Sequence, residues 1–156
     1  SGFGSNAIKN QKLNTPLDVL VVGGGGNDFG SCGNDKNCLT RKLNSFVSPE
    51  LTQGDFLKII KKYSGAKTKT FIVYTSVVGK HAPQKWQNMV KSGLGLAYSK
   101  RMSSLAAKDP NIFWVDAASV LNSDEKTHWL EDGFHPSSVG YKLLVRSIFN
   151  QLCESG

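Results

Sequence analysis

Two short motifs at opposite ends of the chain carry residue types that can act together in acyl transfer. Residues 25–28 read Gly-Gly-Asn-Asp, and residues 132–135 read Asp-Gly-Phe-His. An Asp three residues before a His can accept a hydrogen bond from Nδ1, which leaves Nε2 free to face a nucleophile. An Asn side chain after a Gly-rich turn can donate a hydrogen bond to a developing oxyanion. The motifs therefore predict His135 as general base, Asp132 as its orienting carboxylate and Asn27 as an oxyanion donor.

These two motifs resemble the last two of the four sequence blocks that define the SGNH (GDSL-like) hydrolases. The opening residues 1–6, Ser-Gly-Phe-Gly-Ser-Asn, resemble the Gly block of that family, and the resemblance assigns Gly2 as the second oxyanion donor. It covers nearly the whole chain from residue 1 onward. The resemblance implies a serine esterase, lipase, lysophospholipase or carbohydrate O-acyl esterase, or an O-acyltransferase of the same fold.

The Gly-Asp-Ser block of the family, which should precede Asn27 by several dozen residues on its own strand, has no counterpart in the sequence. Four explanations are open: a precursor cut into two chains, a truncated chain, a circular permutation, or a non-catalytic relative. Permutation is disfavoured, because the segment after His135 has a helical pattern. Ser1 and Ser5 follow no strand that could hold a nucleophile. We therefore expect the serine on an upstream or separate segment that adds a strand beside residues 19–22; the alternative is a binding or assembly module without a nucleophile.

The elements that must position these motifs alternate between strands and helices. Apolar runs that predict parallel strands buried on both faces lie at residues 18–22, 71–74 and 112–115. Apolar residues at helical spacing lie within residues 56–63, 86–105 and 141–152, and Pro136 with Ser137 or Ser138 marks the start of the last helix. Residues 29–51 are predicted to be a loop.

This alternation predicts one α/β domain over residues 1–156, with helices on both faces of a parallel sheet. The family resemblance makes it a three-layer flavodoxin-like fold from which the N-terminal, serine-bearing strand is missing. Gly-X-Gly-X-X-Gly fails at every register through residues 23–26, which disfavours a dinucleotide site. The competing interpretation of Asn27 and Asp28 is that they are ordinary turn residues.

The net charge of +7 and the pI of about 9.4 raise the question of an anionic partner. The lysines are scattered over the polar faces of the predicted helices, so we predict a solvated surface and no nucleic-acid partner. Attraction to anionic envelope material, including contact with a membrane surface, stays open. No apolar run approaches the roughly 20 residues that a transmembrane helix needs.

The three cysteines bear on the cellular compartment. Cys32 and Cys38 bracket a short turn-rich segment that can close as a disulfide in an oxidising environment, and Cys153 is expected to be a buried thiol on the last helix. No His or Cys stands at a spacing that completes a zinc site, so no metal and no cofactor are predicted. His81 and His128 have no Asp three residues before them and are interpreted as surface or loop histidines, with a place in the lining of the cleft as the alternative. We expect a secreted or periplasmic protein acting on a glycan or lipid ester.

Overall fold

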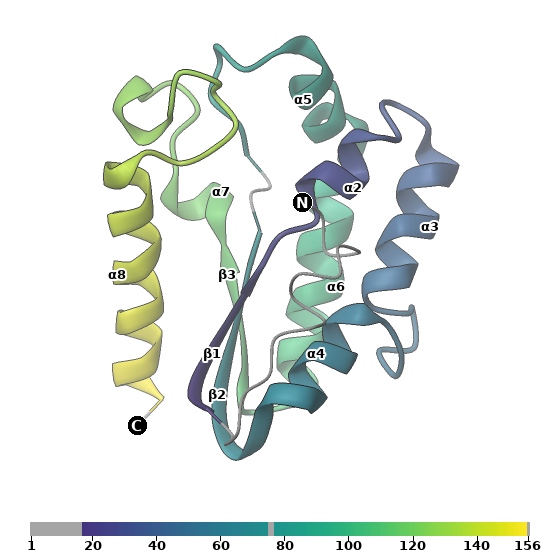
Figure 1. Ribbon diagram of the computed structural model, residues 1–156, viewed down its shortest axis with the longest axis vertical. Coiled ribbons are helices and arrows are strands. Elements are labelled where there is room, and N and C mark those ends of the chain that lie inside the picture. The colour runs from purple at the N-terminus through teal and green to yellow at the C-terminus, as the bar shows by residue number, and fades with distance from the viewer. Residues whose placement is uncertain (1–16, 75–76, 156) are drawn as a thin grey trace.

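The computed structural model describes residues 17–74 and 77–155, which form one parallel sheet covered by helices (Figure 1). Its strands are β1 (Leu17–Gly23), β2 (Ser64–Tyr74) and β3 (Ile112–Asp116), in the spatial order β1-β2-β3. Val21 pairs with Phe71, and Phe71 pairs with Phe113, so these three side chains share one face of the sheet. The three strands predicted from the apolar runs are confirmed.

Helices cover both faces of this sheet, as predicted. One face carries α3 (Lys36–Phe46), α4 (Asp55–Tyr63) and α6 (Gly95–Lys108), while α7 (Ala117–Val120) and α8 (Ser138–Glu154) lie on the other. The short helices at the carboxyl ends of the strands are α2 (Gly26–Gly30) and α5 (Gln84–Met89). Two further short helical segments are η1 (Val90–Leu94) and η2 (Lys126–His128). Right-handed crossovers from β1 to β2 and from β2 to β3 place their helices on the same face.

The hydrophobic core has a large part and a small part. The large part lies between the sheet and α2 to α6 and contains an aromatic cluster in which Phe29, Phe46 and Phe56 are fully or almost fully buried. The small part lies between the sheet and α8, and it includes Phe71 and Leu144. The helix α8 therefore covers only part of its face of the sheet.

The strand β1 is buried on one face and not on both, which corrects the prediction for residues 18–22. Leu20 and Val22 are buried in the large core, whereas Val19 and Val21 are 38% and 52% exposed on the opposite face. A continuous apolar run indicates that both faces of a strand can be buried. Each face is buried only where a helix packs against it. Among the described residues, α8 does not extend far enough to cover this side of β1.

The prediction of a loop over residues 29–51 is wrong, because α3 lies within it. Asp35 begins this helix by accepting hydrogen bonds from the backbone N–H groups of Asn37 and Cys38, at 2.9 and 3.0 Å. The buried residues of α3 are Leu39, Leu43 and Phe46. These residues stand at positions i, i+4 and i+7, which is the apolar spacing of an amphipathic helix.

The disulfide between Cys32 and Cys38 is present, with a Cα–Cα distance of 5.5 Å. The remaining thiol, Cys153, is exposed, which corrects the expectation of burial. Gly140 and Leu144 are the buried residues of α8, and the nine positions from Leu144 to Cys153, at 100° each, place Cys153 on the opposite side of that helix. No helix in the described part of the chain is both long and apolar enough to cross a membrane.

The predicted helix within residues 86–105 is two helices, α5 and α6, joined by the turn η1. Gly93 has a φ of +85° there, a left-handed conformation that an L side chain rarely adopts and that interrupts the helix. The expected start of the last helix is confirmed, because Ser137 precedes α8 and its hydroxyl accepts a hydrogen bond from the N–H of Gly140.

Candidate active site

The first motif lies in the turn between β1 and α2, at the carboxyl end of the sheet. Gly25 directly precedes α2 with a φ of +94°, and a Cβ there would also approach the ring of Phe46. Glycine is therefore required at this position both for the backbone conformation and for the close approach of the aromatic core. The turn presents Asn27 at the surface, as the second residue of α2.

The second motif forms a tight loop between η2 and α8. The Oδ1 atom of Asp132 accepts hydrogen bonds of 2.9 Å from the backbone N–H groups of Phe134 and His135. Gly133 has a φ of +63°, and a Cβ on it would lie 2.5 Å from the backbone nitrogen of Ala82. The loop is also held by the N–H of Gly79, which donates to the carbonyl oxygen of Gly133 at 2.7 Å.

Asp132 and His135 form a hydrogen-bonded pair within this loop. The Nδ1 atom of His135 lies 2.6 Å from Oδ2 of Asp132, and the two side chains are 55% and 47% exposed. Burial raises the pKa of the Asp132 carboxyl, but hydrogen bonds from the His135 ring and from the N–H groups of His135 and Phe134 outweigh it and lower the pKa to about 2. The carboxylate is therefore ionised at neutral pH, and it selects the imidazole tautomer with the proton on Nδ1.

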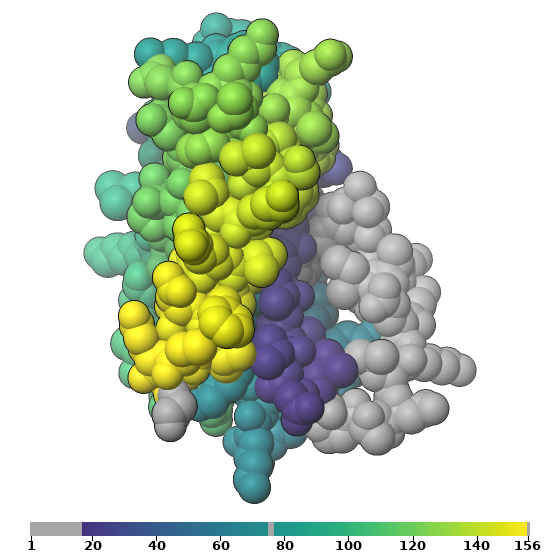
Figure 2. Space-filling model, turned by 90° about the vertical axis from the view of Figure 1, so that its left-hand side faces the viewer, coloured from purple at the N-terminus to yellow at the C-terminus, as the bar shows by residue number. Residues whose placement is uncertain are grey.

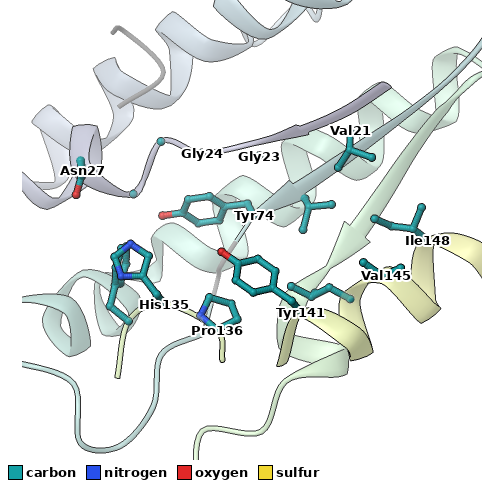
Figure 3. Close-up of a pocket in the computed structure, with 15 residues that line it drawn as sticks. Val21, Gly23, Gly24, Asn27, Tyr74, His135, Pro136, Tyr141, Val145 and Ile148 are labelled. Atoms are coloured by element: carbon teal, nitrogen blue, oxygen red, sulfur yellow. The ribbon is translucent and has the colours of Figure 1, made fainter. Parts of the chain in front are cut away.

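Both motifs line one pocket of about 430 Å³ at the carboxyl end of the sheet (Figure 3). One end of the pocket is polar and contains Asn27 and His135. The other end is apolar, and Val21, Val145 and Ile148 line it. Residues 108 positions apart in the sequence thus share a single cavity, as the α/β fold predicts for strand ends.

Asn27 is exposed, and its side chain makes no hydrogen bond to another described residue. A turn residue that served the fold would use its side chain to cap or close the turn. The Asn27 amide is instead free to donate into the polar end of the pocket.

Tyr74 is a pocket residue that the sequence analysis placed only in a strand. It is 3% exposed at the end of β2, and its hydroxyl has no hydrogen-bond partner among the described residues. Figure 3 shows this hydroxyl directed toward the end of the pocket that holds Gly24 and Asn27. Burial raises the pKa of Tyr74, so the hydroxyl keeps its proton.

The predicted second oxyanion donor, Gly2, lies outside the described residues, as do Ser1 and Ser5. No serine is among the described residues that line the pocket. His81 and His128 do not line it and instead contact the backbone: Nε2 of His81 lies 3.0 Å from the carbonyl oxygen of Leu130, and Nδ1 of His128 accepts from the N–H of Asn122. Within residues 17–74 and 77–155, no group of acidic, His and Cys residues could hold a metal ion.

Comparison with known proteins identifies the family. The model of the GDSL-like lipase/acylhydrolase family matches residues 3–143, which include both motifs and all three strands. A search of curated proteins finds no match to the chain. Because the family match spans most of the sequence and agrees with the observed parallel sheet, the chain belongs to the GDSL-like lipase/acylhydrolase family.

Proposed function

We propose that this protein hydrolyses acyl esters by a serine mechanism in which His135 is the base, Asp132 orients it and Asn27 binds the oxyanion. A serine Oγ attacks the ester carbonyl carbon while its proton passes to Nε2 of His135. The tetrahedral intermediate accepts a hydrogen bond from the Asn27 amide. Collapse releases the alcohol, which takes the proton from Nε2, and leaves an acyl-serine. Water then attacks the acyl-serine by the same route and releases the carboxylic acid.

The observation that carries this proposal is the Asp132–His135 hydrogen bond of 2.6 Å, in the same pocket as Asn27. Proton transfer from a serine needs a neutral imidazole with Nε2 free and oriented. The bond to Nδ1 orients the ring and, in the neutral imidazole, leaves Nε2 without a proton, because a carboxylate can accept only from a protonated nitrogen. The exposed Asn27 amide then supplies a donor for the negative charge that develops at the carbonyl oxygen.

For the nucleophile, we propose a segment that adds a strand to the free edge of β1. Among the described strands, β1 pairs only with β2, so its other edge offers unpaired N–H and C=O groups. β1 ends at Gly23, beside the pocket, and a strand paired parallel to it would end at the same place. A serine at the carboxyl end of that strand would face Asn27 and His135.

The exposed apolar surface beside β1 supports a helix in the same segment. Val21 on β1 faces Tyr141 and Val145 on α8 across the pocket, and we call this surface the β1–α8 groove (Figures 2 and 3). These three side chains are 52%, 54% and 61% exposed, and Phe149 continues the α8 stripe at 63%. A right-handed crossover that leaves the added strand away from β1 places its helix on the face of α8. We propose that this helix covers the groove.

We propose that the substrate is an ester of a glycan or a lipid outside the cytoplasm. Contact of the protein with a membrane surface is compatible with this proposal. Two observations support this location and class. The Cys32–Cys38 disulfide is typical of oxidising compartments. The net charge of +7 attracts the anionic headgroups and acidic glycans of a cell envelope.

Ester hydrolysis by the complete protein tests the proposed chemistry. We expect His135→Ala to lower turnover of acetyl and longer-chain nitrophenyl esters by several orders of magnitude, because no other base replaces Nε2. His128→Ala is the matched control and should retain wild-type turnover, because His128 does not line the pocket and its ring accepts from the N–H of Asn122, outside the loop of the second motif. Equal activity in wild type and His135→Ala would refute the assignment.

A serine-reactive fluorophosphonate probe tests the source of the nucleophile. Peptide mapping should locate the label on a serine outside residues 1–156, at the carboxyl end of the added strand. Label on Ser1 or Ser5 of a lone, folded chain would refute the added segment while keeping the hydrolase. A protein that hydrolyses no ester and takes up no label would support the binding or assembly module.

Substitutions in the groove test whether the segment covers it. We expect Val145→Lys to reduce both labelling and thermal stability, because it places a charge where the helix should pack. Leu96→Lys is the control: Leu96 is 79% exposed on α6, away from the groove. Identical behaviour of the two variants would contradict a covered groove.

A further inference from the structure

The short helix α2 presents a face without side chains toward the second motif. Its first and last residues are Gly26 and Gly30, which lie on one side of the helix because four positions separate them. A Cβ on Gly26 would lie 2.5 Å from Cζ of Phe134, and a Cβ on Gly30 would lie 2.5 Å from Cη2 of Trp86. No real Cβ approaches a ring so closely. The two aromatic rings therefore rest directly on the backbone of α2.

These two rings also stack on each other, with centroids 4.2 Å apart and planes at 18°. We call Trp86 and Phe134 the aromatic bridge. Phe134 belongs to the second motif, and its ring meets the ring of His135 edge to face at 4.9 Å. Trp86 comes from α5, and Nζ of Lys85 lies 4.7 Å from its ring centroid. The bridge thus joins three segments that are far apart in the sequence.

The bridge contacts the immediate neighbours of both groups that face the pocket. Asn27 follows Gly26, on which Phe134 rests, and His135 follows Phe134. The contact of Phe134 with α2 therefore links the segment that carries His135 to the segment that carries Asn27, and a displacement of Phe134 relative to α2 would shift one segment against the other. Trp86 limits that displacement, because it stacks on Phe134 and abuts Gly30 at the same time.

We propose that Trp86 is a positioning residue that acts through Phe134 to set the distance between the oxyanion donor Asn27 and the base His135. This inference rests on the proposed function, in which Asn27 binds the oxyanion and His135 is the base. A reacting group displaced by about 1 Å can cost up to about 100-fold in rate. Trp86 and Phe134 are only half-buried, so their replacement leaves the fully buried aromatic core in place.

Kinetics of the complete protein provide the first test. Trp86→Leu should lower kcat for a nitrophenyl ester by about 10-fold to 100-fold, with a much smaller change in KM, because Trp86 does not line the pocket. Trp86→Phe should recover most of kcat, because a phenyl ring can still stack on Phe134. Trp114→Leu is the control: Trp114 is a half-buried tryptophan that contacts Tyr98 and donates to Ser99, away from the pocket.

Coupling measured by NMR provides a second test that needs no ester hydrolysis. Gly30→Ala forces the ring of Trp86 to move, and we expect it to shift both the His135 ring resonances and the Asn27 side-chain amide resonance. In a Trp86→Leu background the same Gly30→Ala change should shift them much less, because the obstructing ring is gone. Trp114→Leu should leave the effect of Gly30→Ala unchanged.

Equal shifts from Gly30→Ala in the wild-type and Trp86→Leu backgrounds would overturn the proposal, as would the absence of a shift at His135 in both. A loss of kcat in Trp114→Leu as large as in Trp86→Leu would also overturn it, because the effect would then be general destabilisation. If the wild type hydrolyses no ester, the proposed function fails by itself. The NMR arm then still decides whether the bridge couples Asn27 to His135.

Discussion

Replacement of Asp132 by Asn should separate the chemical role of this carboxylate from its structural role. The Oδ1 atom holds the loop by accepting from two backbone N–H groups, while Oδ2 contacts Nδ1 of His135. An Asn can keep the first function, because its carbonyl oxygen also accepts hydrogen bonds. Its amide nitrogen would replace Oδ2, and a nitrogen that only donates cannot accept from Nδ1–H. The His135 ring must then turn away or carry its proton on Nε2.

The expected magnitudes follow from this division of roles. With the proton on Nε2, His135 cannot accept the serine proton, and turnover should fall by about 1,000-fold to 10,000-fold. The loss of stability should be about 1 kcal/mol or less, because both loop hydrogen bonds persist and the pair is half-exposed, which screens its charge. Asp132→Ala also removes the acceptor of both loop hydrogen bonds and should cost more stability, by about 1–3 kcal/mol.

The stability difference between wild type and Asp132→Asn should depend on pH. The folded-state pKa of Asp132 is about 2, below its ordinary value of 3.8, so ionisation favours the folded state. This contribution is fully present above about pH 4 and is lost as the pH falls from 3.8 through about 2. The difference should therefore shrink over that range.

Two measurements check this prediction: the initial rate of ester hydrolysis at neutral pH, and urea unfolding from pH 7 to pH 2. Wild-type turnover in Asp132→Asn would refute the orienting role. Large destabilisation of Asp132→Asn, equal to that of Asp132→Ala, would show that the hydrogen bond to the ring holds the loop. A stability difference independent of pH would show that ionisation of Asp132 is not linked to folding.

Three further predictions concern the pocket and its supports. Asn27→Ala should lower kcat about 100-fold to 1,000-fold with little change in Tm, because the exposed amide makes no hydrogen bond to a described residue; unchanged kcat with a lower Tm would favour the turn interpretation. Tyr74→Phe should be neutral or stabilising by about 1 kcal/mol in urea unfolding, because it removes a buried hydroxyl without a partner, and a clear loss of stability would contradict that geometry. Reduction of the Cys32–Cys38 disulfide should lower the free energy of unfolding by about 2 kcal/mol, measured with and without reductant. A Cys153→Ser variant should lose the same free energy on reduction, because Cys153 is not part of the disulfide.

The sequence by itself determined the features that depend on local spacing. The three strands follow from short β-branched and aromatic runs, and their alternation with helices implies a parallel sheet. The Asp132–His135 contact is equally local, because three residues in a tight loop bring the carboxylate to Nδ1. The helix α3 was also marked by local spacing, but only three buried residues carry its apolar stripe, so the signal was short.

Only the tertiary structure decided which surfaces are covered and which residues meet around the pocket. The apolar run of β1 does not reveal that Val21 faces an open groove, because coverage depends on where α8 lies. Tyr74 has the pattern of a core residue, yet its hydroxyl is directed to the polar end of the pocket. The contact of Trp86 with Phe134 depends on the joint placement of α2, α5 and the second motif. Such contacts arise from the packing of separate elements, which hydrophobic periodicity within one element does not encode.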